Sequence, residues 1–326
     1  MQTTLLGIAI AIILALVAAL VAPLVVDWNQ YRTAFEDEAG RLTGLSVRVG
    51  SIDASILPSP SIKLRNVVIG QADGAPLLQA ATLELELRLG PLMRGEVQAS
   101  EARLLGPQFN LTLDRTGAIV GPKPSAAFRP DNISISRLRI QNGSVVVGDT
   151  ASGASLMLQN LTFDGDVRSL IGPVRGEGAF ASEGHSFVYR ISGAQADDGS
   201  GFHVRLAADP QDYPLTTNLD ATLAFDGSVP QLTGTFALAR PVGVALSNGE
   251  RVMSDPWRAT GAIKATPTSA LIDEIAFQYG PDERAVNFSG KADIRFGAHP
   301  HFSGELKALP GVIETGLFEG FDFEAL

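Results

Sequence analysis

The chain has 326 residues, a formal net charge of −10 at pH 7 and no cysteine. This charge argues against nucleic acid as a partner, and it makes anionic lipid head groups no electrostatic target. The lack of cysteine excludes disulfides and thiolate metal sites. Charged residues make up only 18%, whereas glycine occurs 34 times and proline 19 times. That balance is typical of many strands joined by turns, not of long helices.

The first predicted element is a membrane-spanning helix. The first 26 residues carry no charge, and residues 5–26 are aliphatic apart from Gly7 and Pro23. About 22 residues form a helix of roughly 33 Å, enough to cross a hydrocarbon core of roughly 30 Å. A cleaved signal peptide is the alternative, but it has a basic start and a shorter apolar core. We therefore expect a retained anchor over residues 1–26, which includes Leu5, Ile8, Ile12, Leu16 and Leu20 and is followed by the interface aromatics Trp28 and Tyr31.

A short amphipathic helix is predicted directly after the anchor. Trp28, Tyr31, Phe35, Ala39 and Leu42 follow helical spacing along one face. An N-cap is expected at residue 27 and a glycine end at residue 44. The acidic run 36–38 is interpreted as solvated surface. Arginines at positions 32 and 41 follow the anchor, and by the positive-inside rule alone they would place the bulk of the chain in the cytoplasm.

Strands are predicted from Val47 almost to the end of the chain. The clearest signal with a period of two is the run 83–89, in which leucine alternates with Glu84, Glu86 and Arg88. A proline-rich linker is expected at residues 119–130. It separates a helix-plus-β domain at residues 27–118 from a β-repeat region at residues 131–326. Because no pattern of 10–15 helical residues separates the strands, we expect a mainly β fold with a long antiparallel sheet.

A search for catalytic and metal-binding motifs finds nothing specific. His299-Pro300-His301 has no third metal ligand nearby in the sequence. Nucleophile elbows, phosphate loops, dinucleotide fingerprints and zinc-protease motifs do not occur. Paired carboxylates such as Asp197-Asp198 are better explained as loop residues than as acid–base catalysts. We therefore expect no enzyme, no cofactor and no metal site.

The order of short motifs along the N-terminal third resembles a known family. The motifs are Asp27-Trp28, Tyr31-Arg32, residues 42–47, Gly50-Ser51-Ile52, residues 57–64, residues 66–70, residues 90–97 and residues 104–111. This ordered set resembles the N-terminal region of AsmA-like proteins of Gram-negative envelopes. Residues 175–239 resemble the later β repeats of those proteins.

The resemblance implies a single-pass inner-membrane protein with its bulk in the periplasm, against the charge signal. It implies a long twisted sheet bent into an open groove that carries phospholipid acyl chains and supports outer-membrane assembly or integrity. The implied partners are phospholipid, the inner membrane and envelope-assembly proteins. Family members are commonly longer, and about 14–16 strands at ~4.8 Å each span only ~65–75 Å. The chain also ends without a clear stop, so we interpret it as a truncated relative of a longer protein.

Apolar positions of the alternating strands are the candidate groove residues. They could equally be core residues of a closed sandwich, and the resemblance favours the groove. Two other functions stay open: a membrane-anchored β scaffold that docks envelope-assembly proteins without lipid transfer, and an anchored hydrolase, which the missing motifs disfavour. The groove candidates are Val47, Val49, Leu83, Leu85, Leu87, Leu111, Ile133, Ile135, Val145, Val147, Phe202, Val204 and Leu206.

Overall fold

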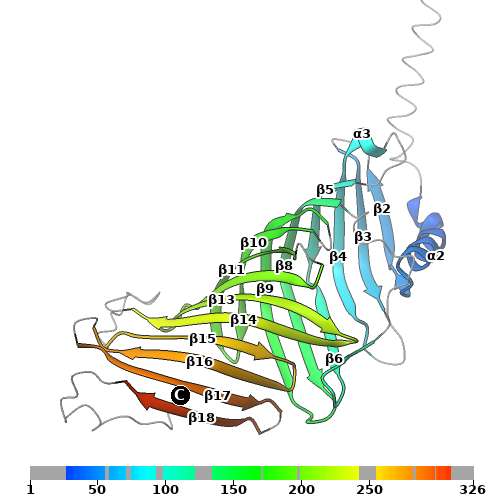
Figure 1. Cartoon of the computed structure of the whole chain (residues 1–326). Helices are drawn as coiled ribbons and strands as arrows, with labels where there is room; N and C mark the ends of the chain where they lie inside the picture. Colours follow the sequence, from blue (N-terminus) through cyan, green and yellow to red (C-terminus); the bar gives the residue numbers. More distant parts are fainter. Residues whose placement is uncertain are drawn as a thin grey trace, which may run out of the picture. The chain divides into compact units, whose positions relative to one another are not determined.

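The chain is mainly β, as predicted (Figure 1). The computed structural model describes residues 27–55, 59–70, 75–92, 98–121, 134–169, 172–196, 199–241, 255–281, 284–297 and 299–309. These residues contain eighteen strands and three short helical segments. The predicted anchor over residues 1–26 lies outside them. Among the residues that are described, no helix is both long and apolar enough to span a membrane.

The chain divides into two compact units. Unit 1 comprises residues 1–112, 120–148 and 155–183, and unit 2 comprises residues 113–119, 149–154 and 184–326. Most of the predicted linker, residues 122–130, lies outside the described residues; before it, Ile119–Val120 form the short strand β7.

Unit 1 begins with the predicted amphipathic helix, as a 3-10 turn η1 (Trp28–Tyr31) followed by α2 (Arg32–Thr43). The Asp27 carboxylate accepts a hydrogen bond from the Asn29 N–H at 3.0 Å, and Gly44 ends α2 at a φ of 74°, as predicted. The predicted apolar face is too wide, because Tyr31 and Leu42 are 53% and 55% exposed. The strands beneath the helix are only two and five residues long, so they cover only part of this face.

The strands of unit 1 form a mixed sheet, not the purely antiparallel sheet that was predicted. Both β1 and β2 pair with β3, and β3–β4, β4–β5, β8–β9 and β9–β10 are antiparallel. However, β5 and β8 are parallel. The twenty residues 114–133 between β6 and β8 are enough for the crossover that a parallel pair needs. The bounds are β1 (Val47–Arg48), β2 (Ser51–Ser55), β3 (Ser61–Ile69), β4 (Leu78–Leu87), α3 (Leu89–Leu92), β5 (Gln98–Leu105), β6 (Gln108–Leu113), β8 (Ser134–Asp149), β9 (Ser155–Val167) and β10 (Val174–Ser182).

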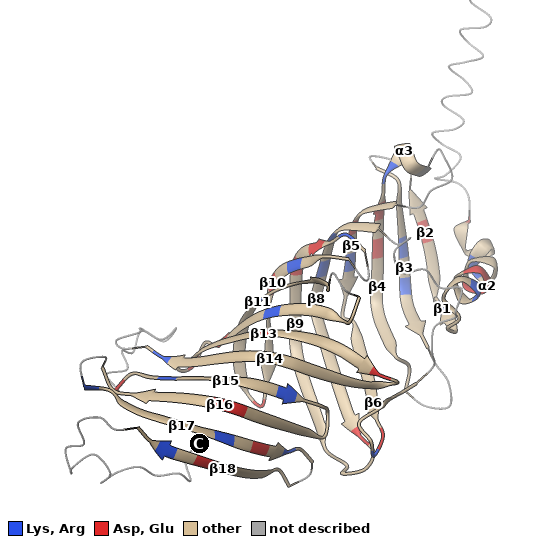
Figure 2. Cartoon of the chain, viewed as in Figure 1, with Lys and Arg blue, Asp and Glu red and all other residues tan. Residues whose placement is uncertain are grey.

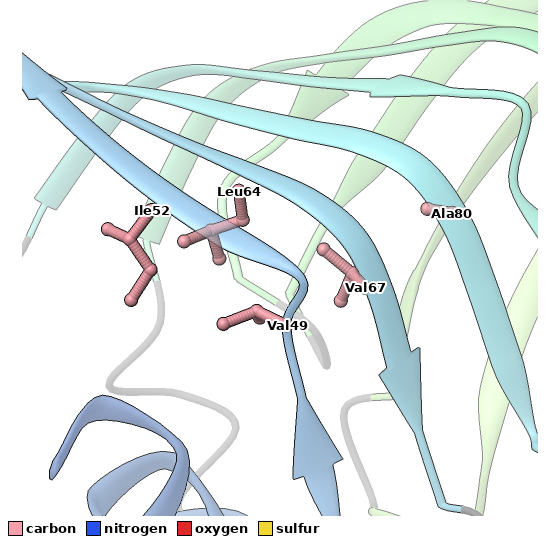
Figure 3. Packing of buried hydrophobic residues seen from close by; sticks show 5 residues of the cluster. All are labelled: Val49, Ile52, Leu64, Val67 and Ala80. Atoms are coloured by element: carbon pink, nitrogen blue, oxygen red, sulfur yellow. The ribbon is translucent and has the colours of Figure 1, made fainter. Parts of the chain in front are cut away.

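A compact hydrophobic cluster lies between the helix and the first strands (Figure 3). It consists of Val49, Ile52, Leu64, Val67 and Ala80, each at most 6% exposed, and Trp28 and Phe35 pack against it. Leu64 and Val67 are three residues apart, which strict alternation would place on opposite faces. The left-handed backbone of Asn66, with a φ of 51°, lies between them and shifts the phase of the strand. Both side chains therefore enter the same core.

Side chains of the helix also occupy the edge of the sheet at β1 and β2. The Ile52 N–H donates to Asn29 Oδ1 at 3.0 Å, and the Val49 N–H donates to Glu36 Oε1 at 2.8 Å. Glu36 is therefore not merely solvated surface, as the acidic run had suggested. These contacts protect an edge that would otherwise present unpaired amides.

Unit 2 is an antiparallel meander in which each strand pairs with the next along the chain, as the glycine-punctuated pattern predicts. Two short segments from earlier in the chain, residues 113–119 and 149–154, also belong to unit 2. The Ile119 N–H donates to the Ser228 carbonyl at 2.9 Å, and the Thr150 N–H donates to the Leu113 carbonyl at 3.0 Å, which links the two segments. The bounds are β11 (His185–Gln195), β12 (Phe202–Pro210), β13 (Thr216–Asp226), β14 (Val229–Arg240), β15 (Trp257–Ala265), β16 (Ser269–Tyr279), β17 (Val286–Arg295) and β18 (His301–Ala308).

Candidate functional site

One face of unit 2 is apolar across all eight strands. Directly opposite residues of antiparallel strands point to the same side of a sheet, so the registers identify the members of each face. Leu206, for example, lies opposite Leu219, which lies opposite Phe236. We call this side the apolar face of unit 2; its larger members are Phe187, Tyr189, Ile191, Phe202, Val204, Leu206, Leu219, Leu223, Leu232, Phe236, Leu238, Trp257, Ile263, Ile272, Ile275, Phe277, Tyr279, Val286, Phe288, Ile294, Phe302 and Leu306.

The other face of unit 2 is polar. Figure 2 marks where charged residues occur along its strands. Asp220 accepts from Arg205 Nε at 2.9 Å and lies 3.0 Å from His203 Nε2. Lys291 Nζ lies 3.9 Å from Glu305 Oε2 across the last strand pair. These side chains alternate with the apolar ones, so water solvates one side of the sheet while the other side needs an apolar neighbour.

No second layer buries the apolar face within the residues that the structure describes. Among the described residues of unit 2, the buried hydrophobic side chains are the small ones of Ala221, Ala270 and Ala292, at 2–4% exposure, together with Pro210. The larger side chains stay partly exposed, and Phe302 and Leu306 at the last strand are 68% and 53% exposed. In unit 1, by contrast, the helix covers residues as large as Leu64, which is 3% exposed. The apolar face of unit 2 therefore lacks the cover that a closed sandwich would provide.

Aromatic rings and glycines shape this face. The ring centroids of Trp257 and Phe277 lie 6.0 Å apart, and those of Phe277 and Phe288 lie 5.9 Å apart. At Gly234 the backbones approach so closely that a Cβ would lie 2.2 Å from the Asp220 carbonyl oxygen. Burial on this face raises the pKa of Tyr189 to about 12. The surroundings thus disfavour a charge, as expected for a surface that receives apolar groups.

Most predicted groove residues that the structure describes lie on apolar sides of the two units. In unit 1, Leu83 and Leu85 lie opposite Leu104 and Ala102, and Leu87 lies opposite Ala99. Ala99 lies beside Ile135 in the parallel pair, and Val145 and Val147 lie opposite Leu158 and Leu156. In unit 2, Phe202, Val204 and Leu206 belong to the apolar face.

The remaining predicted residues have other surroundings. Val49 is only 4% exposed and belongs to the cluster beneath the helix. Val47 lies opposite Ile69 in the short strand β1, and Leu111 lies in β6. Ile133 falls outside the described residues, as do the anchor positions before residue 27. Trp28 packs against the hydrophobic cluster, and its ring lies 6.2 Å from that of Tyr31.

Sequence reasoning did not single out the part of the apolar face of unit 2 that lies beyond β12. Strands β13 to β18 contribute Phe236, Phe277 and Phe288, none of which was singled out. These strands show the same alternation, but glycine or alanine occupies many of their apolar-face positions, so fewer large apolar residues mark the pattern. Examples are Gly234, Gly261, Gly290 and Gly304, which all lie on the apolar side. Only the registers show that these short runs form one face.

A ladder of ion pairs on the other face of unit 1 was also missed. Arg137 Nε pairs with Asp164 Oδ1 at 2.7 Å, Arg139 Nη1 with Glu101 Oε1 at 2.8 Å, and Arg103 Nε with the same Glu101 oxygen at 2.7 Å. The Arg103 guanidinium lowers the pKa of Glu101, and Arg137 lowers that of Asp164. The ladder joins β5, β8 and β9, so it favours the register that gathers the apolar side chains on the opposite face.

The described residues show no metal-binding constellation. Within the described ranges, no three His, Asp or Glu side chains are grouped so that they could hold an ion. The most extensive chemical feature of the described residues is instead strands with one apolar and one charged side.

Comparison with protein families agrees with the motif order. The model of the AsmA family matches residues 2–195, which is more than half of the chain, and the chain therefore belongs to the AsmA family. Membership indicates an envelope-associated protein, in a family that is not known for enzymatic activity. No curated protein and no solved structure matches the chain.

Proposed function

We propose that this protein handles phospholipids, with acyl chains lying against the apolar face of unit 2, and that it supports outer-membrane assembly or integrity. The observation that carries the proposal is the uncovered apolar face, since Phe302 and Leu306 stay 68% and 53% exposed while Lys291 and Glu305 occupy the other side. A large exposed apolar surface indicates a binding site. Membership in the AsmA family agrees with a role in the cell envelope.

The physical drive for acyl chains is sufficient. Each CH₂ group removed from water contributes about 0.8 kcal/mol, so two tails of about 16 carbons each provide ample binding energy even when only partly covered. An acyl chain has no polar atom along its length, so a face built mainly from Phe, Leu and Ile side chains would not select a tail length by hydrogen bonding. The proposal therefore places selectivity, if any, at the head group and not along the tails.

The proposed location is the periplasmic side of the inner membrane, to which the predicted helix over residues 1–26 would anchor the chain. Support comes from the uncharged and mostly aliphatic sequence of that segment and from the family. In this arrangement unit 1 follows the anchor directly, so the hydrophobic cluster beneath α2 would lie near the membrane surface.

The test compares two neighbouring residues of β12 that point to opposite faces. Leu206 lies on the apolar face, opposite Leu219, whereas Ala207 lies opposite Asn218 on the polar face. The full chain, extracted in detergent and washed, is analysed for bound phospholipid by mass spectrometry. We expect Leu206→Asp to lower the bound phospholipid per chain by several fold and Ala207→Asp to leave it unchanged.

The same pair of variants separates the alternatives. If the apolar face belonged to a closed core, Leu206→Asp would unfold unit 2, which circular dichroism would detect. If both variants folded and bound the same amount of phospholipid as the parent chain, the proposal would be wrong. In that case a docking role for envelope-assembly proteins would be the better explanation of the apolar surface.

A further inference from the structure

Among the described residues, no strand is paired with the outer edge of β18, the last strand described in unit 2. Every residue of β18 is exposed, and its register is with β17. The Leu309 N–H donates to the Asn287 carbonyl at 2.8 Å, and this bond fixes which backbone groups of β18 face β17. They are those of the odd-numbered residues, so the amides of Phe302, Gly304, Leu306 and Ala308 point the other way.

This edge lacks the protection seen at β1 and β2. There, side chains of η1 and α2 accept hydrogen bonds from the Ile52 and Val49 amides. Along β18, no described side chain accepts from an outward amide, and residues 301–308 contain no proline. An edge strand of this kind is a template for pairing with another strand.

We propose that β18 pairs with β18 of a second copy of this chain. A two-fold axis at Leu306 places Leu306 opposite its counterpart and Gly304 opposite Ala308. The outward amides of these residues then form the hydrogen bonds of an antiparallel pair. Because paired residues share a face, the apolar faces of the two copies lie on the same side of the joined sheet.

Charge selects this register over its neighbours. With the axis at residue 306, Glu305 lies opposite Lys307 of the second copy, and symmetry repeats the pair. With the axis at residue 305, the two Glu305 carboxylates would face each other, and with the axis at residue 304, His301 would face Lys307. Only the first register pairs opposite charges directly, on side chains that are solvent-exposed in the single chain. The inference concerns assembly and holds whether or not the apolar face binds lipid.

Cysteine cross-linking reads the register directly, because the chain has no cysteine of its own. In the full chain in detergent, Leu306→Cys places two thiols on directly opposite residues, whose Cα atoms lie about 5.5 Å apart and within disulfide range. The controls Gly304→Cys and Ala308→Cys place theirs roughly 14 Å apart, because the copies are offset there by four residues at ~3.4 Å each. Mild oxidation should therefore give a disulfide-linked dimer with Leu306→Cys and little with either control.

Charge reversal tests the same pairing without cysteine. Glu305→Lys and Lys307→Glu each place like charges opposite each other at two symmetric positions, so each should raise the dimer dissociation constant about tenfold. The double variant Glu305→Lys/Lys307→Glu should restore the parent value, as measured by sedimentation of the full chain over a concentration series.

Three results would overturn the proposal. The first is a monomer at every concentration, as expected if residues beyond 309 cover the edge. The second is equal cross-linking at all three cysteine positions. The third is a dimer whose dissociation constant is unchanged by both charge reversals. The last would indicate that another part of the chain, such as the segment before residue 27, forms the contact.

Discussion

A very close approach between two strands of unit 2, β13 and β14, gives the sharpest stability prediction. At Gly234 a Cβ would lie 2.2 Å from the Asp220 carbonyl oxygen and 2.4 Å from the Ala221 Cα. Ordinary contact begins near 3.4 Å, so Gly234→Ala must move β13 and β14 apart by about 1.2 Å or bend one of them. Overpacking of this kind costs about 1–3 kcal/mol, against which the lower entropy of the unfolded alanine chain returns about 0.4–1 kcal/mol. We expect a net loss of about 1–2 kcal/mol.

The assay uses the only two tryptophans of the chain, Trp28 in unit 1 and Trp257 in unit 2. In a Trp28→Phe background, the fluorescence of Trp257 follows urea unfolding of unit 2 alone. Gly304→Ala is the matched control, because the nearest contacts of a Cβ at that position are 3.3 Å or longer. A Gly234→Ala variant as stable as Gly304→Ala would refute the reasoning that close strand approach requires glycine there.

Three further predictions concern unit 1 and the exposed edge. The pKa of Asp164 is lowered from 3.8 in the folded chain, so its ionised form stabilises the fold above that pH. This contribution is lost as the pH falls through the folded pKa. In urea titrations, Asp164→Asn should therefore lose less stability than the parent chain when the pH falls below about 4. Asn29→Ala leaves the Ile52 amide without its acceptor, and hydrogen exchange at that amide should speed up, with a cost of about 1–3 kcal/mol. Leu64→Ala should destabilise unit 1 by about 2–5 kcal/mol, whereas Leu306→Ala, 53% exposed, should cost unit 2 under about 1 kcal/mol; equal losses would contradict the placement of the core.

Helix caps, glycine ends and the alternation of apolar residues predicted much of this fold, because each depends only on residues that are close together in the sequence. The cap at Asp27 and the glycine end of α2 depend on neighbours in sequence, and the structure confirms both. The alternating run 83–89 is a strand only as far as Leu87, where β4 ends, because Leu89 begins α3. The parallel pair β5–β8 could not be predicted in the same way, because its two strands are far apart in sequence: β5 ends at Leu105 and β8 begins at Ser134.

The candidate site shows the same division. Phe202, Val204 and Leu206 were found from their alternation, whereas Phe236 and Phe277 were not, because glycine and alanine occupy many apolar-face positions in their strands. Alternation also could not show that Val49 would be buried beneath the helix while Phe302 stays solvent-exposed, because burial depends on which elements pack together in space.

The central claim is that lipid contacts the apolar face of unit 2 and not the polar one. Phe236 and Thr235 are neighbours in β14 that point to opposite faces, since Phe236 lies opposite Leu219 and Thr235 opposite Asp220. A photo-crosslinking residue is introduced at each position in the full chain in cells, and adducts are identified by mass spectrometry. We expect phospholipid adducts at position 236 and none above background at position 235. Equal adducts at both positions, or protein adducts alone at position 236, would contradict it.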